Sequence, residues 1–494
     1  MTRQVRRLSG LMLGLFLALF VNLNVVQVLR ADDLADHPAN GRLIIQEYRI
    51  RRGSIVVGDT PIARSEGTDD EYKYLRVYEP ATLYSHLVGY YSIEVQRAGL
   101  ERTMNDPLTG TRTDILAENL AQLFGERDPA GDTVRLTVEP AVQQAAADAV
   151  GPLTGAVVAI DPRTGEVLAH YSNPTYDPNV LSSHDRGSIQ EYWRQLNDDP
   201  ARPLIDRAVF ERYQPGSVMK LIVAAAALEH DIGVDTQFED PVSYTPPGTT
   251  RPIHNYSGGT CEDTGTITFG QALIVSCNTV FARLGVQLGA DRLVEQAEKF
   301  GLNRRPPYEL PVSASVIPKE LDQPATAQSA IGARDVQVTA LQMAMVAGAI
   351  VNDGVLMRPR VIVEVLDPSG RRLSATSAAP WVDGPYTAQA VSRETAATLR
   401  GLMIRVVEVG TGHNAAIEGA IVGGKTGTAD PGEEVTPHAW FVGFAEVPEG
   451  GGGSVPRVAV AVVLPNAGEG ATGGGTAAPI ARAVMAAALA SRAP

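Results

Sequence analysis

The stretch GAVVAIDPRTGEVLAHY, residues 155–171, decides the fold of this chain. Two mainly apolar runs flank the turn-forming residues Asp161 to Gly165, so the pattern predicts an antiparallel β-hairpin. An alanine-rich helix is expected near the end of the chain, over residues 477–491. Strand patterns return shortly before that helix, over residues 421–428, 440–446 and 458–464.

The residues between these strands show mainly helical periodicity, from about residue 209 to 354. Helices are expected over residues 217–228 and 339–351, and a further helix over 139–150 leads into the hairpin. Because strands lie at both ends of this part with helices inserted between them, we predict an α+β fold. Its expected form is an antiparallel sheet covered by helices, together with a helical subdomain.

Three short motifs follow one another within this part of the chain, and each occurs once. They are Ser217-Val218-Met219-Lys220, Ser276-Cys277-Asn278 and Lys425-Thr426-Gly427-Thr428. Two of the chain's five lysines belong to these motifs. Together and in this order, the motifs are typical of serine enzymes that transfer an acyl group. Taken one at a time, they also have ordinary structural interpretations: a helix cap, a turn and the end of a strand.

Ser217 is the candidate nucleophile. It follows a Pro-Gly pair and opens an apolar helix, so its backbone N–H lies where a developing oxyanion is stabilised. Lys220 lies about one helical turn further along and is the candidate base that removes the serine proton. For this role the pKa of Lys220 must fall, and both burial and a nearby positive charge on Lys425 would lower it.

The other two motifs supply candidate residues for proton transfer and substrate binding. Ser276 is expected to relay a proton between the two lysines and the leaving amine, and Asn278 to hold a substrate peptide group. Lys425 ends a strand and offers a positive charge to a substrate carboxylate. Because Gly427 has no side chain, a substrate backbone is expected to pair alongside this strand. The expected substrate-binding residues are Thr426, Gly427 and Thr428, and the expected oxyanion hole is formed by the N–H groups of Ser217 and Thr428.

Composition and charge disfavour several other classes of function. The 494 residues carry a formal net charge of −14, which disfavours a nucleic-acid partner. No His-Glu-x-x-His or Cys-x-x-Cys spacing occurs, so we predict no metal site. The glycine runs do not precede Lys-Ser or Lys-Thr at a helix start, and we predict no cofactor.

Residues 8–29 form an uncharged, mainly apolar run of 22 residues, which is long enough as a helix to cross a bilayer. The flanking charges are Arg3, Arg6 and Arg7 before the run and Asp32, Asp33 and Asp36 after it. By the positive-inside rule, the N-terminus stays in the cytoplasm and the rest of the chain is exported. We expect an uncleaved single-pass anchor in inner-membrane lipid; a cleaved signal peptide is the alternative.

The chain is expected to have three parts. A cytoplasmic stub and transmembrane anchor occupy residues 1–30, a small mixed pedestal domain with a linker helix occupies 31–150, and the main domain occupies 151–494. The two cysteines, Cys261 and Cys277, both lie in the main domain. In an oxidising compartment they allow one disulfide, which would hold the second motif beside the site; two buried, unpaired thiols are the alternative.

At these motifs the chain resembles the class B penicillin-binding proteins, the D,D-transpeptidases that cross-link peptidoglycan. Other segments carry the same resemblance: Arg52-Gly53, Gly99-Leu100-Glu101, Gln214-Pro215-Gly216-Ser217, Ala330-Ile331-Gly332, Thr339-Ala340-Leu341-Gln342-Met343-Ala344 and Gly410-Thr411-Gly412. The resemblance covers nearly the whole exported chain. It implies a transpeptidase domain of the penicillin-binding-protein and β-lactamase type, preceded by the pedestal.

The resemblance implies that Ser217 attacks the D-Ala-D-Ala carbonyl of a peptidoglycan stem peptide, and that an amine of a neighbouring strand then accepts the acyl group. It also implies that β-lactams acylate the same serine, and that a SEDS-type membrane glycosyltransferase is a partner. The alternatives are a D,D-carboxypeptidase and a non-catalytic penicillin-binding sensor or scaffold that activates such a glycosyltransferase. A β-lactamase is disfavoured because the Glu-x-x-Asn spacing that one common form uses to activate water does not occur.

Overall fold

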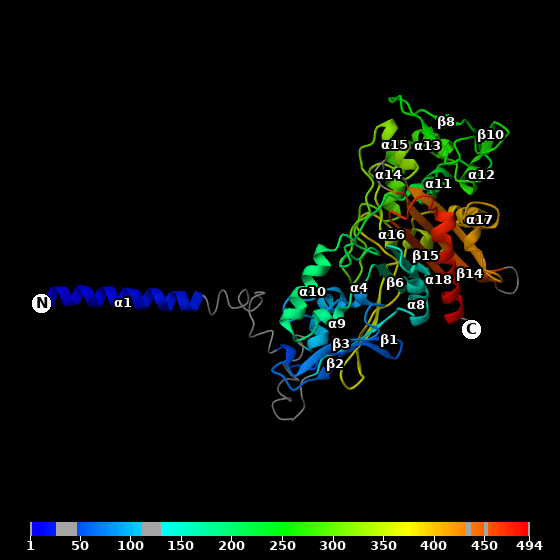
Figure 1. Cartoon of the computed structure of the whole chain (residues 1–494). Helices are drawn as coiled ribbons and strands as arrows, with labels where there is room; N and C mark the ends of the chain where they lie inside the picture. Colours follow the sequence, from blue (N-terminus) through cyan, green and yellow to red (C-terminus); the bar gives the residue numbers. More distant parts are fainter. Residues whose placement is uncertain (1, 26–46, 111–129, 430–435, 449–452, 493–494) are drawn as a thin grey trace.

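The computed structural model describes residues 2–25, 47–110, 130–429, 436–448 and 453–492. A five-stranded antiparallel sheet forms the centre of the main domain (Figure 1). The strand order is β13 (Ile421–Ala429), β14 (His438–Pro448), β15 (Ser454–Leu464), β5 (Gly155–Ile160) and β6 (Val167–Asn173). The predicted hairpin and the three predicted strands are therefore confirmed, and β13 lies at one edge of the sheet.

Helices cover both faces of this sheet, as predicted. α8 (Pro140–Val150) and α18 (Ala478–Ser491) pack on one face, whereas α16 (Ala340–Val351) packs on the other. Alternate residues of β5 point to the two layers: Ala156, Val158 and Ile160 toward α16, and Val157 and Ala159 toward α8 and α18. Because both faces are buried, this strand is apolar at every position and shows no polar alternation.

The helical subdomain lies at the top of the molecule in Figure 1, and the pedestal strands lie at the bottom. The helices of the subdomain are α11 (Lys220–Leu228), α12 (Phe269–Ile274), α13 (Asn278–Leu288), α14 (Ala290–Lys299) and α15 (Gln323–Ala330). Two short antiparallel pairs interrupt the predicted helical pattern: β7 (Gln237–Glu239) with β10 (Thr266–Thr268), and β8 (Ser243–Tyr244) with β9 (Ile253–His254). Prolines and glycines between residues 241 and 259 explain the interruption.

The pedestal contains a six-stranded sheet that is assembled from distant parts of the chain. Its order is β12 (Arg372–Ala375), β11 (Ile362–Leu366), β4 (Thr133–Leu136), β1 (Ile55–Val57), β2 (Thr60–Gly67) and β3 (Tyr74–Tyr78). β1 and β4 pair in parallel, and the other neighbours are antiparallel. Since β11 and β12 follow α16 in the chain, the later part of the sequence contributes two strands to the pedestal.

Arg52 and Glu101, from two segments that resemble the family, meet inside the pedestal. Arg52 Nε lies 2.6 Å from Glu101 Oε2, and Arg76 Nε lies 2.6 Å from Glu101 Oε1, with all three side chains buried. Removing one member of such a group leaves a buried charge unpaired, which typically costs about 3–5 kcal/mol. We therefore assign these residues a structural role.

One described helix, α1 (Thr2–Asn24), is long and apolar enough to cross a membrane, over Val5–Asn24. Residues 26–29 of the predicted apolar run, and the acidic residues that follow it, lie outside the described residues. The remaining described α-helices are α4 (Ser85–Val88), α5 (Gly99–Thr103), α6 (Asn105–Thr109), α9 (Pro178–Leu181), α10 (Arg186–Asp198) and α17 (Arg393–Glu408).

Candidate active site

The first motif lies at a sharp turn that leads into a buried helix. The 3₁₀ turn η3 (Gly216–Met219) continues into α11, so Ser217 lies at a helix N-terminus. Gly216 has a φ of +54°, and its N–H donates to Gly332 O at 2.9 Å. A Cβ on Gly332 would lie 2.0 Å from Gly216 O, so this close contact requires glycine. It holds the chain immediately before Ser217.

Ser217 is half-buried and lines a cavity of about 870 Å³. Residues of the second and third motifs line the same cavity: Ser276, Asn278, Thr426 and Thr428. The fold thus brings together three motifs that are far apart in the sequence. Lys220 and Lys425 are not part of the cavity wall, and both side chains are fully buried.

Ser276 connects the two buried lysines. Lys425 Nζ donates to Ser276 Oγ at 2.8 Å and to Thr426 O at 2.9 Å. Lys220 Nζ lies 2.7 Å from Ser276 O, 2.7 Å from Asn278 Oδ1 and 3.3 Å from Ser276 Oγ. No carboxylate among the described residues forms a salt bridge with either lysine, so no such counter-charge favours their protonated forms.

Burial lowers the pKa of Lys220 well below its usual value, and the nearby charge of Lys425 lowers it further. Burial also lowers the pKa of Lys425, to about 7. Both causes that the sequence predicts for Lys220 are therefore present. A neutral Lys220 amine has two hydrogens and one lone pair. Donation to Ser276 O and Asn278 Oδ1 uses the hydrogens, which leaves the lone pair to accept a proton.

Ser217 Oγ is not among the hydrogen-bond partners of Lys220. The two residues lie on consecutive turns of the same helical segment, η3 followed by α11. Contacts between a nucleophile and its base often tighten only when substrate is bound, so this geometry is compatible with proton transfer. The roles of Ser217 as nucleophile and Lys220 as base stay predictions.

The second motif forms a bend between α12 and α13. Ser276 has a φ of +65°, which is unusual for a residue with a side chain. Asn278 begins α13, and its amide is already engaged: Oδ1 accepts from Lys220, and Nδ2 donates to His254 O at 3.0 Å. The sequence predicts that Asn278 offers both a donor and an acceptor to a substrate. In the structure, one N–H of the amide is left for such a contact.

The third motif lies in β13, which has a strand partner, β14, on one side. The missing side chain of Gly427 makes room for the first motif. A Cβ there would lie 2.8 Å from Pro215 O and 3.0 Å from Val218 Cγ1. The sequence predicts a different reason for glycine, the approach of a substrate backbone. Packing against the helix that carries Ser217 is the reason that the structure supports.

Ser217 and Thr428, the residues predicted to form the oxyanion hole, are brought near each other by the approach of Gly216 to Thr428. Gly216 directly precedes Ser217, and a Cβ on Gly216 would lie 3.0 Å from the carbonyl carbon of Thr428. Thr428 Oγ1 also accepts a hydrogen bond from Gly473 N at 3.3 Å. The backbone just before the first motif therefore lies close to the third motif, as an oxyanion hole shared between the two motifs requires.

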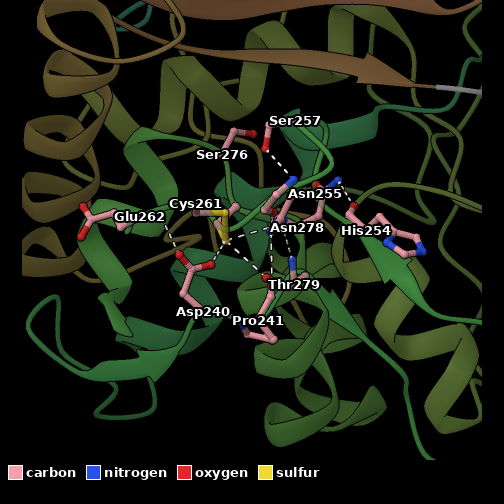
Figure 2. Close-up of a disulfide and its surroundings, with 12 residues drawn as sticks. Asp240, Pro241, His254, Asn255, Ser257, Cys261, Glu262, Ser276, Asn278 and Thr279 are labelled. Atoms are coloured by element: carbon pink, nitrogen blue, oxygen red, sulfur yellow. Dashed lines mark hydrogen bonds between the residues drawn. A yellow bond between two sulfur atoms is a disulfide. The ribbon is translucent and has the colours of Figure 1, made fainter. Parts of the chain in front are cut away.

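A disulfide links Cys277, the middle residue of the second motif, to Cys261 (Figure 2). Together with Asp240, the two cysteines place potential metal-binding atoms within 4.8 Å of one another. Cysteine binds metals as a thiolate, and both sulfur atoms are committed to the disulfide. In its oxidised form this cluster therefore does not fit a metal.

Several cavity residues lie outside the three motifs: His254, Asn255, Tyr256, Thr411, His413 and Thr472. Thr411 belongs to the Gly-Thr-Gly segment of the resemblance, and its Oγ1 lies 2.6 Å from Thr426 Oγ1. Thr472 precedes a glycine run and caps the short helix η5 (Gly473–Ala477), a recognisable capping signal. Asn255 and Tyr256 lie in an irregular loop, and no sequence pattern indicates a role for them.

Comparison with known families matches most of the described chain. Residues 155–486 match the penicillin-binding protein transpeptidase domain, and residues 52–134 match the penicillin-binding protein A dimerisation domain. The chain is 39% identical to the peptidoglycan D,D-transpeptidase PbpA of Mycolicibacterium smegmatis, over 99% of both chains. It is 38% identical to the PbpA of Mycobacterium tuberculosis, again over 99% of both.

Solved structures show the same similarity. Penicillin-binding protein A from M. tuberculosis, as a ceftriaxone acyl-enzyme complex, superposes with a TM-score of 0.85 at 38% identity, over 90% of this chain and 100% of that one. The D,D-transpeptidase domain of a peptidoglycan glycosyltransferase from Eggerthella lenta gives a TM-score of 0.76 at 36% identity, over 90% and 99%.

Proposed function

The chain belongs to the penicillin-binding protein transpeptidases and is a serine-type peptidoglycan D,D-transpeptidase, and we propose that Ser217 is the residue that carries the acyl group. One observation supports this assignment above the others. Ser217 lines the cavity, and beside that wall lie two buried lysines of lowered pKa that are joined through Ser276. This arrangement supplies a nucleophile, a neutral base and a path for protons.

In the proposed acylation step, Ser217 Oγ attacks the carbonyl carbon between the two D-alanines. The serine proton passes to the Lys220 amine, because its lowered pKa favours the neutral form. The N–H groups of Ser217 and Thr428 stabilise the oxyanion, and one such donor typically contributes about 10²–10³ in rate. The C–N bond then breaks, and D-alanine leaves with a proton that Lys220 returns through Ser276 Oγ.

The edge position of β13 supports binding of the stem peptide as an additional strand. Thr426 and Thr428 line the cavity and offer hydroxyl groups to the terminal carboxylate. Lys425 precedes Thr426 in β13, donates to Thr426 O at 2.9 Å, and contributes positive charge when protonated. Its pKa of about 7 means that a bound carboxylate, which favours the charged form, would keep it protonated.

In the second step, the amine of a neighbouring stem peptide attacks the acyl-enzyme and restores the free serine. A β-lactam presents its ring amide to the same Ser217, and opening the ring leaves the drug attached. The structures of the M. tuberculosis relative as acyl-enzymes with ceftriaxone and imipenem support this part of the proposal.

The anchor and the pedestal indicate where this chemistry takes place. We assign residues 1–30 to a cytoplasmic stub and transmembrane anchor. Residues 31–150 form the pedestal, to which β11 and β12 add two strands, and the rest of 151–494 forms the catalytic domain outside the membrane. Arg3, Arg6 and Arg7 support a cytoplasmic N-terminus. A SEDS-type membrane glycosyltransferase is the proposed partner, because cross-linking requires glycan strands that are made beside the same membrane.

Labelling with a fluorescent penicillin tests the assignment. Ser217→Ala is expected to abolish covalent labelling in a folded protein, and Lys220→Ala to abolish it nearly as completely. Ser257→Ala is the matched control, since Ser257 lines the same cavity and should keep wild-type labelling. Persistent labelling of the Ser217 variant would remove this serine from the nucleophile role. Mass spectrometry of the products from stem-peptide strands then separates cross-linking, which gives dimers, from trimming, which gives free tetrapeptide.

A further inference from the structure

Helix α13, which carries Asn278, begins without a side-chain cap of its own. Its N-cap residue is Cys277, which makes no capping hydrogen bond and whose sulfur is bonded to Cys261. The first N–H groups of a helix have no partners within the helix and need them from elsewhere. At the start of α13, these N–H groups donate to the side chain of Asn255, which lies 23 residues before Asn278 in the chain.

Asn255 is buried, with 6% of its surface exposed, and both ends of its amide are engaged (Figure 2). Its Oδ1 accepts from the N–H groups of Asn278, at 3.0 Å, and Thr279, at 3.1 Å. Its Nδ2 donates to Gly259 O at 2.9 Å and to Pro241 O at 3.5 Å. The amide therefore connects the start of α13 to the irregular loop that ends at Cys261.

The preceding residue, His254, holds the side chain of Asn278. His254 O accepts from Asn278 Nδ2 at 3.0 Å, so the amide oxygen of Asn278 faces Lys220 Nζ at 2.7 Å. Two adjacent residues of one loop thus set both the backbone position and the side-chain orientation of Asn278. Because Lys220 also contacts Ser276 O and Oγ, moving the start of α13 would move every oxygen that holds this amine.

We propose that Asn255 is a positioning residue of the transpeptidase, which caps α13 beside the disulfide and so holds Ser276 and Asn278 against Lys220. It acts through Asn278 and takes no part in the chemistry itself. The inference rests on the proposed role of Lys220 as the base. A displacement of about 1 Å in a catalytic group can cost about 10²-fold in rate, so loss of this cap is expected to slow acylation strongly.

The test compares second-order rates of acylation by a fluorescent penicillin in the full-length protein. Asn255→Ala removes the cap and is expected to acylate about 10- to 100-fold more slowly than the wild type. Asn255→Asp keeps an oxygen facing the two N–H groups, and when protonated it also donates to Gly259 O. Because aspartate caps helices about as well as asparagine, this variant is expected to recover the rate to within about threefold.

Asn179→Ala is the matched control. The Asn179 amide also binds the backbone at both ends, through Tyr78 N at 2.8 Å and Tyr78 O at 3.0 Å, but it belongs to none of the three motifs. This variant is expected to keep the wild-type acylation rate. If Asn255→Ala does not fold, Asn255→Ser replaces it, because the serine hydroxyl is one bond shorter and does not reach both N–H groups.

Three results would each overturn the proposal: wild-type acylation by Asn255→Ala, an equal loss in the Asn179 control, or no recovery in Asn255→Asp. Lys220→Ala separates this inference from the proposed function. Normal acylation by that variant would remove Lys220 as the base. Loss of acylation in Lys220→Ala together with an unaffected Asn255→Ala would remove only the role of Asn255.

Discussion

Reduction of the disulfide tests how firmly the second motif is held by its covalent link. The bond joins Cys261 and Cys277, which are 16 residues apart. For a closed loop of this length, the chain-entropy model gives a stabilisation of about 3 kcal/mol. Since about 1.4 kcal/mol corresponds to a factor of ten in an equilibrium constant, reduction should increase local opening of this region about a hundredfold.

Hydrogen exchange followed by mass spectrometry measures this opening directly. After reduction, peptides from residues 253–261 and from the start of α13 are expected to exchange about a hundredfold faster, because local opening limits exchange there. Peptides from β5 and β6 serve as an internal control, since these strands lie in the central sheet and do not contact the disulfide. Acylation by a fluorescent penicillin should slow in parallel, because Ser276 and Asn278 then hold Lys220 less firmly.

A cysteine variant separates the bond from other effects of the reductant. Cys261→Ser cannot form the bond, so it should exchange quickly with or without reductant and acylate at the rate of the reduced wild type. Equal exchange of the second motif in the oxidised and reduced wild type would refute the reasoning. In that case the hydrogen bonds of Asn255 alone would hold the motif, and the disulfide would add nothing measurable to its position.

Two further predictions concern the charge and the packing of the site. Lys425→Gln removes the charge that helps to lower the pKa of Lys220, so that pKa rises and the acid limb of the acylation pH profile moves to higher pH. Lys425→Arg keeps the charge and is the control. If the acid limb does not move in Lys425→Gln, the charge of Lys425 does not lower the pKa of Lys220. Gly332→Ala places a Cβ 2.0 Å from Gly216 O and should abolish penicillin labelling. Gly370→Ala is the control. Gly370 has a φ of +85° and no atom lies within 4 Å of the new Cβ, so this variant adds backbone strain alone and should keep penicillin labelling.

Local signals in the sequence were sufficient to predict many of the strands and helices of the main domain. The β5–β6 hairpin follows from a turn between two apolar runs, and α8 begins at Pro140 because proline suits the first helical turn. The pairing of β11 with β4, which brings β12 into the same sheet, was not predictable in this way. It joins segments more than 200 residues apart, and no local pattern specifies which distant edge a strand will meet.

In the candidate site, too, features with a local sequence pattern could be predicted, whereas features that depend on distant contacts could not. The order of the three motifs predicted Ser217, Lys220 and Lys425 as candidates, because each motif needs its residue types at a fixed local spacing, and the structure brings the three motifs together. The cap that Asn255 provides could not be predicted from the sequence, because it depends on how an irregular loop packs against α13. A packing reason for glycine at position 427 was also not predictable, because only the fold places Val218 next to it; the approach of a substrate backbone stays a prediction.

The backbone of Ser276 explains why this site needs its surrounding support. A residue with a side chain pays about 1–2 kcal/mol to adopt the left-handed conformation that Ser276 has, and glycine would adopt it freely. Glycine, however, would lack the hydroxyl that lies between Lys220 and Lys425. The proposed proton path therefore needs a side chain at a position where the backbone conformation favours glycine. A strained residue of this kind persists only where its neighbours determine its position, and the disulfide at Cys277 and the Asn255 cap on the next two residues act immediately beside it.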